Sequence, residues 1–332
     1  MSSMRIIEVP TGKIFVLKGD DENKRMECLS LRDYGQPKNC KAQFLGLNDD
    51  INGVDNDNPL LPFEDKWVIT ISTQYGCACN CRFCDVPRVK FQGNISYHEM
   101  MRQVNVALFN EPQVKHPKRI NLHYARMGEP TFNRDVFDHV RGVKEYIRLF
   151  YGDRDIKLHP VISTMMPRSN PHLEEFVNRW CTNIKNNLFN GDAGLQLSIN
   201  STDDKQREFQ FGGHALPLRD IATIAKALPK PWGRKYTLNF ALADDTIIDA
   251  QLLAELFGTE KFIVKITPVH NTKASEKNGI KTAEGYERFT PYQKAEEELI
   301  KAGFDVLIFV PSYNEEVGRI TCGNAILSDA YC

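Results

Sequence analysis

The chain from Trp67 onward alternates between two spacings of its hydrophobic residues. Short β-branched runs, such as WVITIST at 67–73, are typical of strands, and longer runs with apolar residues three or four positions apart are typical of helices. The spacing predicts strands at 67–73, 119–125, 156–164, 194–200, 235–243, 261–269 and 304–310. Helices are predicted at 94–109, 132–150, 171–184, 218–228, 246–257 and 290–303. Asn94 or Ser96 is the expected N-cap of the first helix.

Strands that alternate with helices build a parallel sheet with right-handed crossovers. Because six strand–helix units precede the last strand, we expect an α/β fold with a partial (β/α)6 barrel and not a doubly wound open sheet. No GxGxxG sequence follows the first strand, which argues against a dinucleotide-binding fold.

The segment before Trp67 has a different character. GKIFVLK at 12–18 and RMECLSL at 25–31 alternate apolar and polar residues around a polar turn, which predicts a β-hairpin. Residues 47–62 are rich in Asn, Asp, Gly and Pro and are interpreted as a linker. We therefore predict an N-terminal β-hairpin region and linker at 1–65, and a barrel with a C-terminal tail carrying Cys322 at 66–332.

Composition narrows the class of protein. Of the 332 residues, 42% are hydrophobic and 26% are charged, as in a soluble globular protein with a large core. No run reaches the roughly 18 apolar residues of a membrane span, and the N-terminus lacks an apolar signal core, so we expect a cytoplasmic protein without membrane contact. The net charge of -1 argues against a strong overall attraction to nucleic acid, although it leaves room for a local basic face.

Cysteines are concentrated after the first predicted barrel strand. Nine cysteines in a reducing compartment indicate metal binding or catalysis more than disulfides. Cys77, Cys81 and Cys84 have the spacing CxxxCxxC, and three such thiolates can bind one face of an iron–sulfur cubane while one iron stays open. The loop lies at a strand's carboxyl end, where barrel active sites are found. A zinc site with Cys79 as fourth ligand is a cramped alternative, and an inert cysteine loop is another.

This loop resembles the signature of the radical S-adenosylmethionine (SAM) enzymes, with Phe83 where that family usually has an aromatic residue. The resemblance implies a partial radical SAM barrel and a 4Fe–4S cluster on Cys77, Cys81 and Cys84 whose open iron binds SAM. It further implies cleavage of SAM to a 5′-deoxyadenosyl radical, with an electron donor such as flavodoxin or ferredoxin. Gly128 and Glu129 resemble the segment that contacts the SAM amino group, since a carboxylate suits an ammonium.

Further motifs resemble the RlmN/Cfr-type RNA adenine methyltransferases. These motifs are the segments 72–77, 91–95, 127–130 with Asn133, 163–164, 197–201, 266–271 and 318–324. By this resemblance Ser163, Ser198, Asn200 and Asn271 also contact SAM.

The same resemblance implies a role for Cys322 in the tail. Adenine C2 and C8 are electrophilic carbons, so SAM, itself an electrophile, cannot methylate them directly. Cys322 would take a methyl group first, and the radical would abstract hydrogen from that group before the carbon adds to an adenine base in RNA. Glu27 is the candidate base for the ring proton, and a second cysteine would release the product by forming a disulfide.

The chain departs from this family at two places. Thr70 occupies the position of the second cysteine. Cys28, Cys40 or Cys79 would have to substitute for it. The family's N-terminal RNA-binding domain is expected to be missing, because the sequence begins close to the hairpin. Two alternatives therefore stay open: a divergent radical SAM enzyme acting on another nucleotide-like or peptide substrate without methyl transfer, and a non-enzymatic iron–sulfur or zinc protein that binds nucleic acid.

Overall fold

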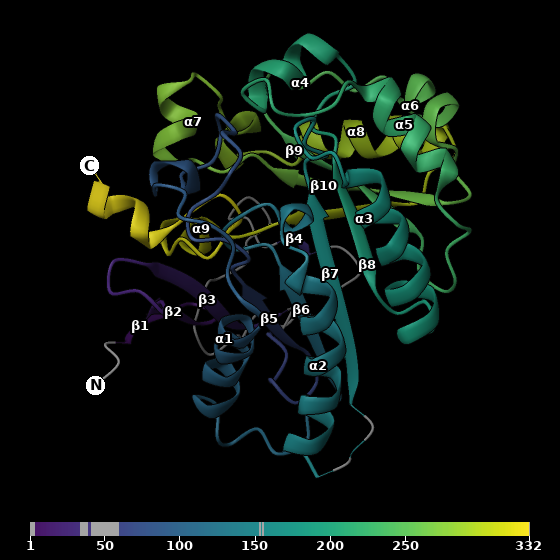
Figure 1. Ribbon diagram of the computed structural model, residues 1–332. Coiled ribbons are helices and arrows are strands. Elements are labelled where there is room, and N and C mark those ends of the chain that lie inside the picture. Colours follow the sequence, from purple (N-terminus) through teal and green to yellow (C-terminus); the bar gives the residue numbers. More distant parts are fainter. Residues whose placement is uncertain (1–3, 34–38, 41–59, 153, 155, 332) are drawn as a thin grey trace.

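The strands of the protein form one curved sheet, as the computed structural model in Figure 1 shows. The structure describes residues 4–33, 39–40, 60–152, 154 and 156–331. The strands are β1 (Arg5–Val9), β2 (Gly12–Lys18), β3 (Arg25–Arg32), β4 (Asn39–Cys40), β5 (Trp67–Ile71), β6 (Arg119–Tyr124), β7 (Lys157–Thr164), β8 (Gly194–Ser198), β9 (Tyr236–Leu242), β10 (Phe262–Pro268) and β11 (Val306–Val310). Within the described chain the sheet has 11 strands in the order β1-β2-β3-β5-β6-β7-β8-β9-β10-β11-β4.

Helices fill the connections between the parallel strands. They are α1 (Tyr97–Phe109), α2 (Asp135–Phe150), α3 (Leu173–Arg179), α4 (Asp204–Gln210), α5 (Leu218–Ala227), α6 (Ala250–Phe257), α7 (Lys273–Lys277), α8 (Thr290–Lys301) and α9 (Tyr313–Val317). From β5 to β11 each strand is parallel to the next one in the sheet, and the order of these strands in the sheet follows their order in the chain. In the described part β1 and β4 are the two edges and do not pair with each other, so the barrel is partial, as predicted.

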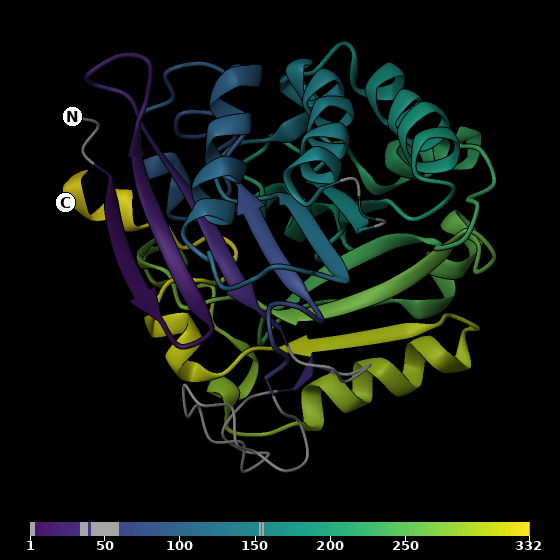
Figure 2. The ribbon, with the colours of Figure 1, turned by 90° about the horizontal axis from the view of Figure 1, so that it is seen from below.

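The two faces of the sheet differ in polarity, which explains the period of two in the strands. On β5 the side chains of Trp67, Ile69 and Ile71 are fully buried, whereas Val68 and Thr70 alternate with them and are only partly buried. The buried set belongs to the main hydrophobic core. Figure 2 shows the helices on the outer side of the curved sheet. Their apolar faces cover the outer side, and the inner side is left for partly exposed, mostly polar side chains.

The predicted elements are confirmed with small shifts at their ends. Ser96, and not Asn94, caps α1, because its Oγ accepts a hydrogen bond from Glu99 N at 3.4 Å. The helix predicted at 171–184 divides into α3 and a π-helical segment, Trp180–Leu188. The short elements α4, α7, α9, β1 and β4 were not predicted.

The predicted hairpin is confirmed as β2 and β3, and β3 pairs antiparallel with β5. The sheet is therefore continuous from the hairpin into the barrel, and the division at residue 65 stays a prediction. Most of the linker predicted at 47–62 lies outside the described residues. The C-terminal segment Ile326–Tyr331 lies beside the hairpin strands in both views (Figures 1 and 2). No helix in the described residues is both long and apolar enough to cross a membrane.

Candidate active site

The cluster loop, residues 76–85, leaves the carboxyl end of β5 and carries the three predicted ligands. Gly76 begins the loop at a φ of +73°, and a side chain there would meet Val89 O at 2.5 Å, so only glycine allows this turn. Cys81 and Cys84 are partly buried and lie close to Cys77, and burial together with the neighbouring thiols raises the pKa of both. The structure thus brings the predicted ligands together.

The donor set fits a cluster better than a single ion. In the described residues, no three or more His, Cys, Asp or Glu side chains are arranged to hold one metal ion. The cysteines of a cubane each bind a different iron and need not converge on one point. Cys79 is buried, and its backbone N–H donates to Cys77 Sγ at 3.4 Å, so it supports the loop from inside.

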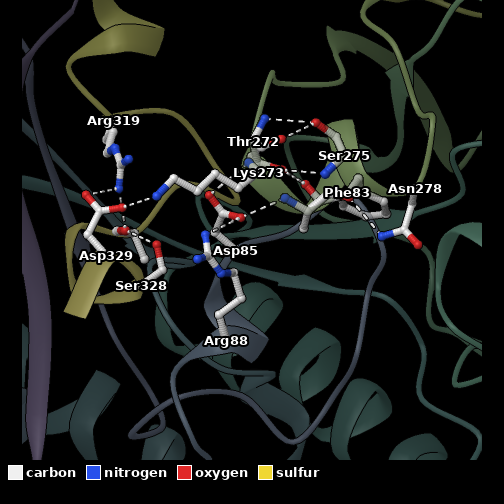
Figure 3. Close-up of polar contacts among 12 residues, drawn as sticks. Phe83, Asp85, Arg88, Thr272, Lys273, Ser275, Asn278, Arg319, Ser328 and Asp329 are labelled. Atoms are coloured by element: carbon white, nitrogen blue, oxygen red, sulfur yellow. Dashed lines mark hydrogen bonds and ion pairs between the residues drawn. The ribbon is translucent and has the colours of Figure 1, made fainter. Parts of the chain in front are cut away.

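Helix α7 and the residues that flank it hold the cluster loop through hydrogen bonds (Figure 3). The buried Asp85 carboxylate accepts the Ala274 N–H at 2.9 Å and the Lys273 N–H at 3.3 Å. Thr272 Oγ1 donates to Phe83 O at 2.8 Å, and Asn278 Nδ2 donates to Arg82 O at 3.0 Å. Sequence reasoning missed this support, although Thr272 and the residue three positions later form a capping box.

Gln74 joins the cluster loop to the turn after β6. Its Oε1 accepts the N–H groups of Ala78 and Glu129, each at 3.1 Å, and its Nε2 donates to Asn94 Oδ1 at 2.8 Å. Gly128 has a φ of +98°, and a Cβ there would lie 2.6 Å from Gln74 Cβ. Gly128 is therefore required for the close approach of two loops. Its predicted contact with SAM stays a prediction.

Glu129 is a buried carboxylate, and no Lys, Arg or His among the described residues forms an ion pair with it. Its Oε1 accepts the Thr131 N–H at 3.1 Å and the Thr131 hydroxyl at 2.8 Å, and its Oε2 accepts the Met165 N–H at 3.0 Å. Burial raises the pKa of Glu129, although these hydrogen bonds oppose the shift. An oriented, buried carboxylate without a cation is suited to receive an ammonium group from a ligand.

The other predicted SAM contacts lie at or near the carboxyl ends of β7, β8 and β10. Ser163 Oγ on β7 donates to Gln196 Oε1 at 3.4 Å, and Ser198 is the last residue of β8. Asn200 has a φ of +60°, and its Oδ1 accepts the Ala241 N–H at 3.1 Å. Such strained backbone is typical of functional sites.

Two further predicted contacts flank these strand ends. Asn271, three residues after the end of β10, accepts the Thr282 hydroxyl on its Oδ1 at 2.9 Å. The Phe83 ring packs edge-on against Phe211, with 5.6 Å between the ring centroids.

Cys322 lies beside the cluster loop. The Asp85 N–H donates to Gly323 O at 2.8 Å, which joins the residue after Cys84 to the residue after Cys322. The Cys322 side chain is accessible to solvent. Desolvation by the surrounding protein raises the pKa of Cys322, and the nearby cations Lys265 and Arg126 oppose that rise. The thiol is therefore accessible to solvent while protein groups, Lys265 and Arg126 among them, lie close to it.

Glu27, the candidate base, is fully buried on β3 and paired with Arg126. Its Oε2 accepts from Arg126 Nε at 2.9 Å and from an Arg126 terminal nitrogen at 2.5 Å. Its Oε1 accepts the Leu327 N–H at 2.6 Å. The structure thus places Glu27 under the tail, with both oxygens engaged by protein donors.

The three cysteines that could substitute for the missing second cysteine lie in different parts of the fold. Cys28 lies in the core, and its thiol donates to Gln103 O on α1 at 3.7 Å, away from the inner face. Cys79 contacts Cys77 in the cluster loop. Cys40 ends β4 opposite Val310 in the register, and its side chain lies outside the described residues.

Two residues on the inner face of the sheet, His123 and Lys265, were not predicted from the sequence. Thr70 is opposite His123 in the register of β5 and β6. Burial, with Lys265 on β10 as a nearby charge, lowers the pKa of His123 to about 3. Burial likewise lowers the pKa of Lys265, and Cys322 opposes that shift. A neutral imidazole and a lysine therefore lie in the same barrel mouth as Cys322; only the alternation of the strands could have indicated them.

The chain is similar to known proteins in its sequence and in its fold. No family model matches the chain. Over 233 residues it is 27% identical to a probable dual-specificity RNA methyltransferase RlmN of Heliobacterium modesticaldum, an overlap of 64% of this chain and 54% of that relative. It is 29% identical over 235 residues to a probable dual-specificity RNA methyltransferase RlmN of Dictyoglomus turgidum, covering 69% and 62% of the two chains. The crystal structure of a radical SAM methyltransferase from Sphaerobacter thermophilus has a TM-score of 0.65 over 97% of this chain and 80% of that one, at 17% identity.

The chain is similar in sequence to proteins named RlmN and similar in fold to a radical SAM methyltransferase. The likeness to the solved structure confirms the predicted fold class. This RlmN-like chain spans about half the length of the first curated relatives it matches, 54% and 49% of them.

Proposed function

We propose that this RlmN-like chain is a radical SAM methyltransferase that modifies an adenine base in RNA through Cys322. The contact between the tail and the cluster loop carries the proposal. The 2.8 Å hydrogen bond from the Asp85 N–H to Gly323 O keeps a solvent-accessible thiol next to the three predicted cluster ligands. A thiol that only stabilised the fold would be packed in the core, as Cys181 is.

The binding residues follow from the donor chemistry. Cys77, Cys81 and Cys84 would hold a 4Fe–4S cluster, and Glu129 would accept hydrogen bonds from the ammonium group of SAM. When bound, the cluster and SAM supply the methyl group and, with an electron from a flavodoxin- or ferredoxin-type donor, the 5′-deoxyadenosyl radical. Ser163, Ser198, Asn200, Asn271 and the Phe83 ring would orient SAM from the strand ends.

Cys322 would be the nucleophile that takes the methyl group. Desolvation raises the pKa of Cys322, and Lys265 and Arg126 oppose part of that rise. The two cations would therefore stabilise the thiolate, the reactive form of cysteine, when the methyl group is transferred. The thiol is exposed and lies near Lys265 of β10, so a substrate base bound beside that strand would meet the methyl carrier.

The substrate in this proposal is single-stranded RNA. The Arg82 guanidinium lies over the Phe209 ring, 4.5 Å from its centroid, and both side chains are exposed beside the cluster loop. Lys90 and Phe91 follow the loop and are also exposed. Cations beside aromatic faces suit the phosphates and unstacked bases of a single strand. We also place the protein in a reducing cytoplasm, since the seven cysteines whose side chains the structure describes are all free thiols.

The test is peptide mass spectrometry after anaerobic incubation of reconstituted protein with methyl-labelled SAM. We expect the label on Cys322 of the unaltered protein. Cys322→Ser should abolish labelling, whereas the core variant Cys181→Ser should keep it. Formation of 5′-deoxyadenosine with an unlabelled Cys322 would overturn methyl transfer and favour a radical SAM enzyme of another reaction. Absence of iron and sulfide would favour a non-enzymatic protein.

A further inference from the structure

The tail that carries Cys322 is held at both ends by a buried ion pair. We call residues 319–327 the Cys322 loop. Near its end, the Leu327 N–H donates to Glu27 Oε1 at 2.6 Å. At its start, an Arg126 terminal nitrogen donates to Arg319 O at 2.9 Å. Glu27 and Arg126 are themselves joined at 2.5 Å, so one ion pair reaches both ends of the loop.

Burial makes this arrangement stiff. The side chain of Glu27 is 0% exposed and that of Arg126 is 2% exposed. Buried charges cost several kcal/mol to leave unpaired, so neither group can swing away without its partner. The guanidinium fork lets Arg126 serve the carboxylate and the Arg319 carbonyl together, which a lysine could not do with fixed geometry.

A second, more exposed contact fastens the same loop on the outside (Figure 3). Asp329 lies 2.8 Å from an Arg319 terminal nitrogen and 3.2 Å from Lys273 Nζ. Arg319 also donates to Ala325 O at 3.1 Å, across the loop. Because Lys273 belongs to α7, the loop is fastened to the helix that also supports the cluster loop.

We propose that Glu27 and Arg126 form a latch that positions the Cys322 loop over the cluster loop, and that Glu27 is a positioning residue and not the proton acceptor. Arg126 lies three residues before Glu129 in the turn after β6. The latch thus ties the methyl-carrying thiol to the turn that would bind SAM. A base must be within reach of the substrate, but the Glu27 carboxylate accepts three hydrogen bonds from protein donors and its side chain has no exposed surface. The catalytic consequence rests on the proposed function, whereas the latch itself does not.

The test compares hydrogen exchange and thiol alkylation in Glu27→Gln and the unaltered protein, both in the reconstituted form. We expect backbone amides of the Cys322 loop to exchange at least about tenfold faster in Glu27→Gln, since tenfold in an opening equilibrium is about 1.4 kcal/mol. Iodoacetamide should alkylate Cys322 several-fold faster. Exchange in α2 and the iron content should not change.

Matched variants keep the result interpretable. Glu175→Gln removes an exposed glutamate paired with Arg134 at 3.4 Å and should alter nothing. Arg126→Lys keeps the charge without the fork, so the amides of the Cys322 loop should exchange faster in this variant than in the unaltered protein. If Glu27→Gln does not fold, Asp329→Asn tests the exposed end of the latch, with about a threefold faster exchange expected in the same amides.

The outcomes separate the two proposals. Unchanged exchange and alkylation in Glu27→Gln, together with methylated Cys322 but no methylated base, would make Glu27 the proton acceptor and overturn the latch. Faster exchange with slower Cys322 methylation would support it. If the unaltered protein never methylates Cys322, the proposed function fails, and the exchange measurement still decides whether the latch exists.

Discussion

The cluster loop and the Cys322 loop meet at one site but are built in different ways. The cluster loop takes its three candidate ligands from one short segment after β5. The Cys322 loop is positioned by residues far from it in the chain; Glu27 and Leu327, for instance, are 300 residues apart. A local segment can present its ligands once the strand before it has formed. The long-range contacts exist only after the whole sheet has formed.

Two buried glutamates sharpen this contrast. Glu27 is paired with Arg126, whereas no described residue supplies a cation to Glu129. A carboxylate that is already paired with a protein cation contributes to the folded structure and has little capacity to bind a cationic ligand. A carboxylate that is buried without a cation costs stability and gains a partner only when a cationic ligand binds. The four predictions below test this difference, starting with the largest effect.

Loss of a cluster ligand should have the largest effect. Replacing Cys81 by alanine leaves two thiolates for the cluster, so we expect iron content near zero and no cleavage of SAM. Cys79→Ala should keep both, because Cys79 supports the loop without being a ligand. Iron and sulfide analysis with a 5′-deoxyadenosine assay measures both variants. A Cys79→Ala protein without iron would show that the loop binds metal differently.

Breaking the buried ion pair should destabilise the fold strongly. Arg126→Met leaves Glu27 buried and unpaired, so the free energy of unfolding should fall by about 3–5 kcal/mol. Replacing both partners with apolar residues, as in Glu27→Leu with Arg126→Met, should recover most of that loss. Arg134→Met, at an exposed ion pair, should change stability by less than about 1 kcal/mol. Chemical denaturation would measure all three, and a small loss in Arg126→Met would contradict the contrast.

The unpaired glutamate should behave in the opposite way. Its folded-state pKa is raised by burial, so its stabilising contribution is present at acidic pH and is lost as pH rises through that pKa. At neutral pH Glu129→Gln should therefore leave the SAM-free protein equally stable or more stable. SAM binding should weaken by roughly 10- to 100-fold, because a charge-assisted hydrogen bond contributes about 1.5–3 kcal/mol. Calorimetry measures both quantities, and unaltered SAM affinity would contradict the assignment.

The smallest effect concerns the core that supports both loops. His139 on α2 is buried against the Tyr124 hydroxyl at 2.8 Å, and desolvation lowers its pKa to about 3. The unfolded chain takes up this proton near pH 6.5 and the folded chain does not, so stability falls as pH drops below about 6.5. His139→Gln should reduce the loss of stability between pH 7 and 5 by about 2 kcal/mol. The exposed His98→Gln is the control, and an equal pH dependence in both variants would contradict this prediction.

Periodicity predicted the barrel strands and the longer helices because each long element repeats one side-chain pattern against one core. The short helices α4, α7 and α9 escaped prediction, since five to seven residues hold too few repeats for the pattern to stand out. The two-residue strand β4 exists only because β11 is beside it.

The sequence by itself determined the CxxxCxxC loop, the strand–helix order and the presence of a cysteine in the tail, because these depend on nearby residues and on the chemistry of each side chain. Tertiary structure alone decided what the buried charges do. Nothing near Glu27 in the sequence indicates Arg126, and nothing near Asp85 indicates the backbone N–H groups of α7. A charged group's role depends on the partner that reaches it in the folded chain, and the arrangement of the strands and loops decides which partner that is.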